Sequence, residues 1–337
     1  MKDIDWTKLT FSYTETDYMV RCRYENGAWG ELVATKDKTL SIHAAAAGLQ
    51  YAQQCFEGLK AYRRADGTIG VFRPVENALR MQASAKAMYM PPLPTELFLD
   101  AVVLAIRNNL DYLPPYGTGA TLYIRPIMFG TTPKVGVAPA SEFEFCVVVT
   151  PIGPYYPAGF GTTPFVINRH VDRAAPLGTG QYKVGGNYAS SFRATEPAHE
   201  AGMGVLFLDS AEHRYLDECG GANIFLVKNG TYCTPKSDSI LPSIINRSLM
   251  TLCGDLGIPV EERRIPVEEL ADCQEAAACG TGAAISPISR ITDPDTGVVY
   301  NYGEEAGPVC QLLYKSLRDI QFGRVEDKHH WCYLIEE

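Results

Sequence analysis

The sequence predicts a mixed α/β protein built from two domains, and three observations support this. The chain has 337 residues, 46% of them hydrophobic and 20% charged, which is enough for two compact domains with a core each. Strand-like and helix-like segments alternate through the first 160 residues. A passage rich in proline and glycine then separates them from a second set of strands and helices.

The first half contains two clear strands and two amphipathic helices. Residues 121–129 have partial period-two character, and residues 142–149 form a strongly apolar strand pattern. Residues 76–88 and 96–110 have helical periodicity, and Thr95 is a candidate N-cap for the second helix.

Two loops, residues 151–164 and 170–180, mark the domain boundary because both are rich in proline or glycine. We therefore expect a smaller N-terminal domain over 1–163, an interdomain segment over 164–180 and a larger C-terminal domain over 181–337. For the region after the first loop, the pattern predicts strands at 165–168, 205–208, 224–227 and 276–279, and helices at 187–200, 244–256 and 308–320.

Composition argues against several classes of protein. The net charge of −9 and the lack of a dense Lys/Arg run argue against nucleic-acid binding. The N-terminus has no apolar signal region and no stretch is long enough to span a membrane, so we expect a cytoplasmic protein. The ten cysteines have no C-x-x-C spacing and the six histidines no ligand-like spacing, so no metal site is expected.

Lys183 is the strongest candidate for chemistry. It lies in Gln-Tyr-Lys-Val-Gly-Gly-Asn-Tyr, where neighbouring glycines let the backbone approach a flat ligand closely. Glu218 begins a second glycine-rich motif, Glu-Cys-Gly-Gly-Ala-Asn. A Schiff-base lysine together with a carboxylate that keeps a pyridine nitrogen protonated is the residue set used to hold pyridoxal 5′-phosphate.

Three further features could bind the phosphate of that cofactor. Ser243 is a candidate N-cap, which would leave the N–H groups of Ile244 and Ile245 for an anion at a helix N-terminus. Thr281 follows an apolar strand in a loop of small residues, and Arg80 offers a planar guanidinium. Taken singly, each of these also fits an ordinary capped helix, a plain loop or an exposed helical arginine.

Six motifs in one order resemble the branched-chain amino-acid aminotransferases, which are fold-type IV pyridoxal-phosphate enzymes with the D-amino-acid aminotransferase-like architecture. The resemblance covers roughly residues 40 to 325. The motifs are Gln-Cys-Phe-Glu-Gly-Leu-Lys-Ala-Tyr (54–62), Phe-Arg-Pro with Asn-Ala-Leu-Arg-Met (72–81), Leu-Tyr-Ile-Arg-Pro (122–126), Tyr-Lys-Val-Gly-Gly-Asn-Tyr (182–188), Glu-x-Gly-x-x-Asn (218–223) and Asp-Ile-Gln-Phe-Gly-Arg (319–324).

The resemblance implies a cofactor held between the two domains. Lys183 would form the Schiff base and shuttle the proton, Tyr188 would bind the ring's phenolate oxygen and Glu218 the pyridine nitrogen. The phosphate ligands would be Arg80, Thr281 and the N–H groups of Ile244 and Ile245, with support from Arg173.

The same resemblance implies a transamination of L-leucine, L-isoleucine and L-valine with 2-oxoglutarate, in a homodimer with shared active sites. The Thr281–Gly282–Ala283 turn would receive the substrate α-carboxylate, and Arg125 the γ-carboxylate of glutamate. An aromatic pocket would be formed by Tyr51, Phe56, Tyr123 and Tyr155. Val135 and Val137 match a loop that reaches the neighbouring subunit's pocket, and Tyr51 matches a residue contributed across the same interface.

Alternatives remain at the level of the sequence. A D-amino-acid aminotransferase or an aminodeoxychorismate lyase of the same fold would use the same lysine and glutamate, although the Phe-Glu-Gly-Leu-Lys segment favours the branched-chain interpretation. A non-catalytic pyridoxal-phosphate protein should have lost Lys183 or a phosphate ligand, and none is missing. Two departures from the family pattern, Gly221 and Asn246, are expected to alter neighbouring contacts.

Overall fold

The computed structural model describes residue 2, residues 4–154 and residues 160–336, and the chain divides into two compact units. Unit 1 comprises Met1–Pro157, Tyr182–Gly185 and Asp319–Glu337, and unit 2 comprises Ala158–Gln181 and Gly186–Arg318. Both units are discontinuous in the sequence, whereas the sequence suggested continuous segments. Lys183 consequently belongs to unit 1.

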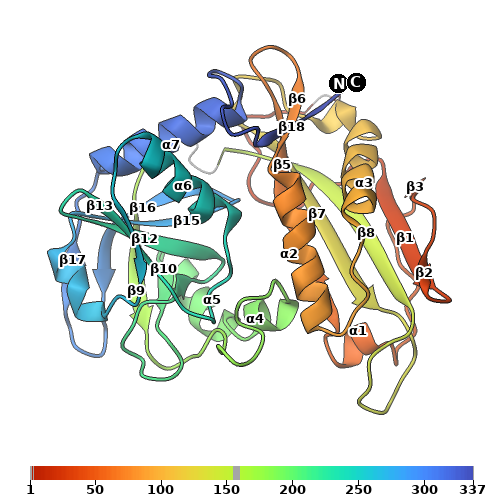
Figure 1. Cartoon of the computed structure of the whole chain (residues 1–337), viewed down its shortest axis with the longest axis horizontal. Coiled ribbons are helices and arrows are strands. Elements are labelled where there is room, and N and C mark those ends of the chain that lie inside the picture. Colours follow the sequence, from red (N-terminus) through yellow and green to blue (C-terminus); the bar gives the residue numbers. More distant parts are fainter. Residues whose placement is uncertain (1, 3, 155–159, 337) are drawn as a thin grey trace. The chain divides into compact units, whose positions relative to one another are not determined.

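Unit 1 is built on an antiparallel sheet with strand order β18-β6-β5-β7-β8-β1-β2, in which β3 also pairs with β1 and β4 with β7 (Figure 1). Its longest pair is β7 with β8, in register from Thr121 opposite Ile152 to Gly130 opposite Phe143. The strands are β1 (Met19–Glu25), β2 (Ala28–Trp29), β3 (Val33–Thr35), β4 (Gln54–Phe56), β5 (Leu59–Arg63), β6 (Ile69–Phe72), β7 (Thr121–Gly130), β8 (Phe143–Ile152) and β18 (Cys332–Ile335).

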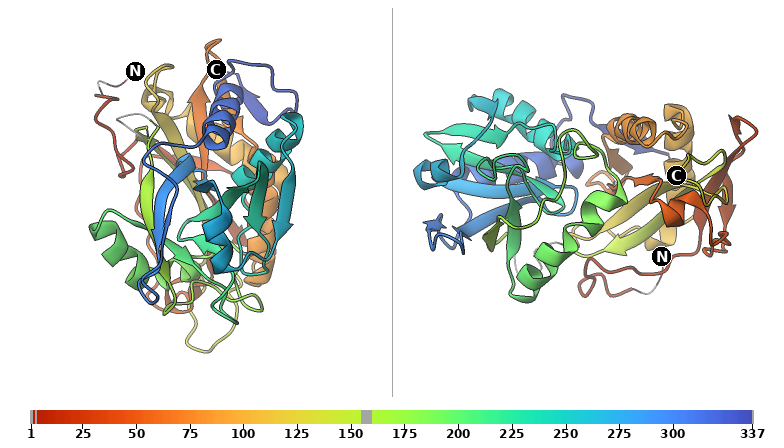
Figure 2. Two further views of the ribbon diagram at one scale, coloured as in Figure 1. Left: turned by 90° about the vertical axis from the view of Figure 1, so that its left-hand side faces the viewer. Right: turned by 90° about the horizontal axis from the view of Figure 1, so that it is seen from below.

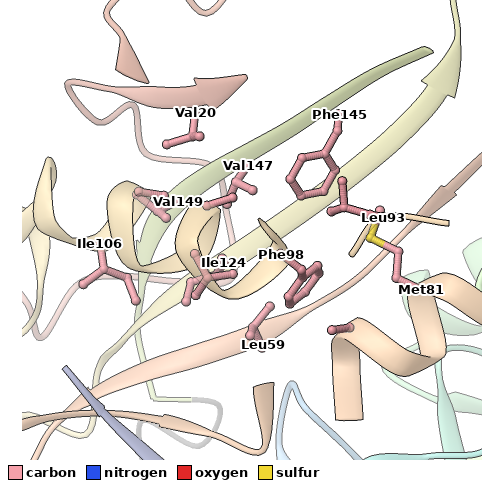
Figure 3. Close-up of a cluster of buried hydrophobic side chains, with 14 of the residues drawn as sticks. Val20, Leu59, Met81, Leu93, Phe98, Ile106, Ile124, Phe145, Val147 and Val149 are labelled. Atoms are coloured by element: carbon pink, nitrogen blue, oxygen red, sulfur yellow. The ribbon is translucent and has the colours of Figure 1, made fainter. Parts of the chain in front are cut away.

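Two helices cover one face of this sheet, α2 (Pro74–Ala87) and α3 (Thr95–Arg107) (Figures 1 and 2). In α3 the buried residues Phe98, Val102 and Ala105 recur at helical spacing, so one stripe of the helix faces the strands. Figure 3 shows this core, where Phe98 lies among side chains of the sheet. The short elements of unit 1 are α1 (Ala47–Gln50) and a 3₁₀ turn, η1 (Leu110–Tyr112).

Unit 2 contains a mixed sheet with strand order β10-β9-β16-β15-β12-β13-β14, where β11 also pairs with β12 and β17 with β16. The parallel pairs are β9 with β10, β9 with β16, and β13 with β14. The strands are β9 (Thr163–Asn168), β10 (Gly204–Phe207), β11 (Glu218–Cys219), β12 (Ala222–Lys228), β13 (Thr231–Pro235), β14 (Val260–Arg263), β15 (Glu275–Gly280), β16 (Ala284–Thr292) and β17 (Val299–Asn301).

The helices of unit 2 pack on this sheet at different strands. Helix α5 (Phe192–Glu200) packs on β9 and β10, and α6 (Ile244–Asp255) packs on β14 and β15. The remaining elements are α4 (Gly185–Ala189), the 3₁₀ turn η2 (Val267–Asp272) and α7 (Pro308–Gln321), of which α4 and α7 cross the limits between the units.

The mixed α/β class and the main predicted elements are confirmed, with two corrections. Thr95 is the first helical residue of α3 and not its N-cap; Pro94 holds that position, and the Thr95 hydroxyl instead accepts a hydrogen bond from Gln82. The single helix predicted over 187–200 is wrong. It divides into α4 and α5 because the Ser190 and Ser191 hydroxyls donate to the carbonyls of Asn187 and Tyr188, which competes with continued helix.

Within the described part of the chain, none of the helices is both long enough and apolar enough to cross a membrane.

Candidate active site

Lys183 is fixed in unit 1 through both of its backbone polar groups. Its N–H donates to the Ser84 hydroxyl of α2 at 3.0 Å, and its carbonyl accepts from the Phe56 N–H of β4 at 3.1 Å. The side-chain amine then lies 4.7 Å from the centre of the Phe56 ring. A short irregular segment is thus held between a helix and a strand, which directs the amine to a defined place.

Phe56 also contacts the predicted substrate residues of β7. Tyr123 and Arg125 are two residues apart on that strand, so their side chains share one face. The Arg125 guanidinium lies 4.8 Å from the centre of the Phe56 ring and donates to the Tyr123 hydroxyl at 2.9 Å. Its Nε is buried and makes no hydrogen bond within the described residues, so the guanidinium has a donor to offer to a carboxylate.

Arg80 is engaged by a carboxylate that the sequence did not single out. Its Nε and Nη2 donate to the two oxygens of Glu57 at 2.8 and 2.9 Å, and Asn77 donates to the same carboxylate at 2.7 Å. Burial alone would raise the pKa of the fully buried Glu57 carboxyl, but the charge and hydrogen bonds of Arg80 hold this pKa below its usual range. The guanidinium edge suited to bidentate binding is therefore occupied by Glu57.

The predicted interface residues lie together in unit 1. The Tyr51 hydroxyl donates to the Val135 carbonyl, which ties the loop between β7 and β8 to the end of α1. Val135 is 80% exposed and Val137 90% exposed, so the loop presents an apolar tip. Tyr155, the remaining residue of the expected aromatic pocket, lies outside the described residues.

Glu218 is a buried carboxylate at the start of β11 in unit 2, and Arg173 is its main cationic partner. The Arg173 Nη1 donates to Glu218 Oε1, while its Nε donates to the Gly220 carbonyl at 2.6 Å. Asn223 donates to the other carboxylate oxygen at 3.1 Å. The Arg173 guanidinium thus binds a carboxylate in this structure, whereas the resemblance suggested support of a phosphate site.

Tyr188 lies beside the same group, with its ring centre 5.4 Å from the Arg173 guanidinium carbon. The preceding residue, Asn187, is buried and exchanges two hydrogen bonds of 2.7 Å with Thr179. The Ser190 hydroxyl donates to the Arg173 carbonyl at 3.0 Å. The structure therefore brings together Arg173, Tyr188 and Glu218, three of the predicted cofactor residues.

Helix α6 begins as the sequence predicted. The Ser243 hydroxyl accepts from the N–H of Asn246 at 3.2 Å, so the cap does not use the N–H groups of Ile244 and Ile245. Asn246, a departure from the family pattern, accepts from the buried Tyr232 hydroxyl at 2.6 Å and donates to Thr234 at 3.0 Å. This residue anchors the helix to β13 rather than facing a ligand.

The predicted carboxylate-binding residues form the connection between β15 and β16. Gly280 pairs with Ala284, which leaves Thr281, Gly282 and Ala283 in the turn. A Cβ placed on Gly282 would meet no atom within 4 Å, so the backbone of this turn is open to an approaching group.

Sequence reasoning missed Glu57 and Ser84 in unit 1 and Asp217 in unit 2. Glu57 lies inside the quoted Phe-Glu-Gly-Leu-Lys segment, and its neighbour Gly58 leaves no room for a Cβ beside the Tyr123 hydroxyl. A charged residue within an otherwise apolar, glycine-containing strand end was the available signal.

The residues present fit pyridoxal 5′-phosphate in their chemistry. Unit 1 supplies a placed primary amine and a buried guanidinium, and unit 2 supplies a buried carboxylate, a phenol and a capped helix N-terminus. The amine matches the cofactor's aldehyde, and the guanidinium and the helix N-terminus match its phosphate. The carboxylate matches the pyridine nitrogen, and the phenol matches the phenolate oxygen.

Comparison with known proteins agrees with this chemistry. The profile of the family described as "Amino-transferase class IV" matches residues 54–291. A curated branched-chain-amino-acid aminotransferase of Haemophilus influenzae is 44% identical over 344 residues, covering 100% of both chains. The crystal structure of the Escherichia coli branched-chain amino acid aminotransferase is 28% identical with a TM-score of 0.79, covering 94% of this chain and 99% of that one.

A third relative carries a cofactor. The crystal structure of a branched-chain amino acid aminotransferase from the source abbreviated T.th., with pyridoxamine 5′-phosphate, is 26% identical with a TM-score of 0.79, and covers 96% of this chain and 99% of that one. The match to the family profile and the full-length similarity to the curated relative together show that this chain belongs to the class IV aminotransferases and, within them, to the branched-chain-amino-acid aminotransferase family.

Proposed function

We propose that this aminotransferase uses pyridoxal 5′-phosphate to exchange amino groups reversibly between L-leucine, L-isoleucine or L-valine and 2-oxoglutarate, by a ping-pong mechanism. The observation that carries the proposal is that the Lys183 amine and the Arg125 guanidinium lie 4.7 and 4.8 Å from the centre of the same Phe56 ring. One apolar surface is thus flanked by an amine and by a cation with a spare donor. That combination suits an aliphatic side chain and a second carboxylate in turn.

The cofactor would be held by Lys183, Arg80, Tyr188, Glu218, Thr281 and the N–H groups of Ile244 and Ile245. When bound, pyridoxal 5′-phosphate supplies an aldehyde for the Schiff base and a protonated ring that stabilises negative charge at the substrate Cα. Glu218, ionised and held by Arg173, would keep the proton on the pyridine nitrogen.

Lys183 would carry the proton transfer. Its Nζ, released when the substrate amine takes its place, removes the Cα proton and delivers it to the cofactor carbon C4′. The two backbone hydrogen bonds of Lys183 keep the chain fixed while the side chain moves, since they engage the helix and the strand and not the amine. The Thr281–Gly282–Ala283 turn would orient the α-carboxylate.

Arg125 would accept the distal carboxylate of 2-oxoglutarate. Its buried Nε lacks a partner within the described residues, and the Phe56 and Tyr123 rings cover its guanidinium. A charge-assisted hydrogen bond made there is stronger than in water because the surroundings are largely apolar.

A half-reaction assay tests the proposal. Without an amino acceptor, L-leucine, L-isoleucine and L-valine should convert the visible absorption of the lysine-bound cofactor to that of its amine form, whereas D-alanine should not. Lys183→Ala should abolish the conversion, and Arg125→Leu should slow the return reaction with 2-oxoglutarate about ten- to hundredfold more than the reaction with leucine. Reaction with D-alanine alone, or an active Lys183→Ala variant, would overturn the assignment.

We further propose a homodimer in which Tyr51, Val135 and Val137 contribute to the partner's substrate pocket. The support is the exposed apolar tip at Val135 and Val137, which the Tyr51 hydroxyl holds in place. Light scattering should give twice the chain mass, and a fully active monomer would contradict the proposal.

A cytoplasmic location is proposed from the thiols. All ten cysteines are free and most are buried, as is usual in a reducing compartment. Cell fractionation tests this, and recovery of the mature protein from an oxidising compartment would contradict it.

A further inference from the structure

The chain between β13 and α6 is held firmly before it reaches the helix that is proposed to bind phosphate. We call residues 237–243 the approach segment. Its Leu241 N–H donates to Glu218 Oε1 at 3.3 Å, and the Leu241 carbonyl accepts from the Asn223 amide at 3.2 Å. Ser243 then caps α6. The approach segment is therefore tied to Glu218 at its centre and to the helix at its end.

A second tie lies two residues earlier in the approach segment, where Ser239 meets Asp217. The Ser239 hydroxyl donates to Asp217 Oδ2 at 2.5 Å, and both residues are buried, with 2% and 6% of their surfaces exposed. The other carboxylate oxygen of Asp217 is buried and has no hydrogen-bond partner within the described residues. Ser239 is consequently a principal restraint on this carboxylate, and the carboxylate on Ser239.

The approach segment is also packed tightly from the loop that follows Arg173. A Cβ added to Gly180 would lie 2.5 Å from Ser239 Cα and 2.8 Å from the Ala175 carbonyl oxygen. Backbone therefore meets backbone at this point, and Ser239 has no room to shift toward Gly180.

We propose that Asp217 is a positioning residue, which acts through Ser239 to fix the N-terminus of α6 relative to Glu218. Two consecutive acidic residues hold alternate residues of the approach segment, since Asp217 binds Ser239 while Glu218 binds Leu241. This inference rests on the proposed function, in which Glu218 addresses the pyridine nitrogen and α6 the phosphate. Asp217 would set the spacing between the protein groups that bind these two ends of the cofactor.

Burial is the physical cost of this arrangement. It raises the pKa of Asp217 above its ordinary value, with hydrogen bonds from Ser239 and Ser237 acting in the opposite direction. A carboxyl group kept in such a place without a role in stability or positioning would be replaced readily by a neutral side chain.

The test compares pyridoxal 5′-phosphate with pyridoxal, which lacks the phosphate, on the full-length apoprotein. Ser239→Ala should weaken binding of pyridoxal 5′-phosphate about tenfold, because one charge-assisted hydrogen bond that places α6 is lost. Binding of pyridoxal, followed by the same visible band, should change less than about twofold, since it needs Lys183 and Glu218 but not the helix N-terminus. General damage to the fold would weaken both ligands equally.

Ser289→Ala is the matched control, because Ser289 is a buried serine of β16 in the same unit. It should leave the affinity ratio of the two ligands unchanged. Asp217→Ala should lower the ratio as Ser239→Ala does, the double variant should lower it no further, and Asp217→Asn, which keeps an acceptor for Ser239, should restore most of it.

An unchanged ratio in Ser239→Ala overturns the inference, as do additive effects in the double variant. If Ser239→Ala fails to fold, the ratio in Asp217→Ala decides instead. Failure of the proposed function gives a different result, because the wild-type protein would then form no Lys183-dependent visible band with either compound.

Discussion

Each unit buries an arginine–glutamate pair, and the two pairs have opposite assignments. In unit 1 the arginine, Arg80, is the proposed cofactor ligand, and the fully buried Glu57 holds it. In unit 2 the carboxylate, Glu218, is the proposed ligand, and Arg173 holds it. A buried ion of either sign is costly when unpaired, so each proposed ligand is paired before any cofactor arrives.

The pairs also differ in what remains when one partner is removed. Arg173 has a second acceptor in the Gly220 carbonyl, and Asn223 has one in the Leu241 carbonyl. Glu57, in contrast, receives both Nε and Nη2 of Arg80 as well as Asn77 and the N–H of Gly58. Unit 1 concentrates its pairing on one carboxylate, whereas unit 2 distributes it over a network.

The largest expected effect follows from this concentration. Glu57→Gln keeps the side-chain volume but leaves the buried Arg80 without its counter-charge, and it should lower the free energy of unfolding of the apoprotein by about 3–5 kcal/mol. Glu218→Gln should cost less, about 1.5–3 kcal/mol, because Arg173 retains the Gly220 carbonyl. Denaturant unfolding of both variants measures the difference, and equal losses would refute the contrast between the two pairs.

The fold was predictable where the signal is local. The period-two pattern of β7 and β8 and the helical spacing in α2, α3 and α6 are visible within about ten to fifteen residues, and all five elements are present. Strand β18 was not predicted. Its residues pair with β6 far away in the chain, from Cys332 opposite Phe72 to Ile335 opposite Ile69, and a short strand at a sheet edge has little pattern of its own.

The candidate site was predictable in part for the same reason. Lys183 and Glu218 stand in glycine-rich motifs that identify them locally. Glu57 and Asp217 acquire their meaning only from Arg80 and Ser239, which lie 23 and 22 residues away. Neither distance follows a helical or strand period, so the pairing depends on tertiary structure.

Acid should separate the two regions further. The folded-state pKa of Glu57 lies below its ordinary value of 4.5, so its contribution to stability is complete above that pH and is lost as the pH falls below it. The folded-state pKa of Asp217 lies above its ordinary value of 3.8, so protonation favours the folded state and stability is gained as the pH falls toward 3.8. The two carboxyls therefore act in opposite directions on acidification.

Unfolding free energies measured from about pH 7 to pH 3 test this. Glu57→Gln should make the acid loss of stability below pH 4.5 shallower, and Asp217→Asn should make the loss steeper, each by at most about 1.4 kcal/mol per pH unit. Shifts of the same sign in both variants would show that one of these environments is assigned wrongly.

The smallest expected effect concerns how helices begin in the two units. Helix α6 of unit 2 starts with a side-chain cap from Ser243, whereas α3 of unit 1 starts after Pro94 without one. Ser243→Ala should therefore cost about 1 kcal/mol in the free energy of unfolding. Thr95→Ala should stay within about 0.5 kcal/mol of wild type, because alanine favours helix at a first-turn position while only the hydrogen bond from Gln82 is lost. Thermal or denaturant unfolding of the two variants decides between them. If Thr95→Ala proved the more damaging, the start of α3 would depend on Thr95 after all, and the contrast between a side-chain-capped and an uncapped helix start would not hold.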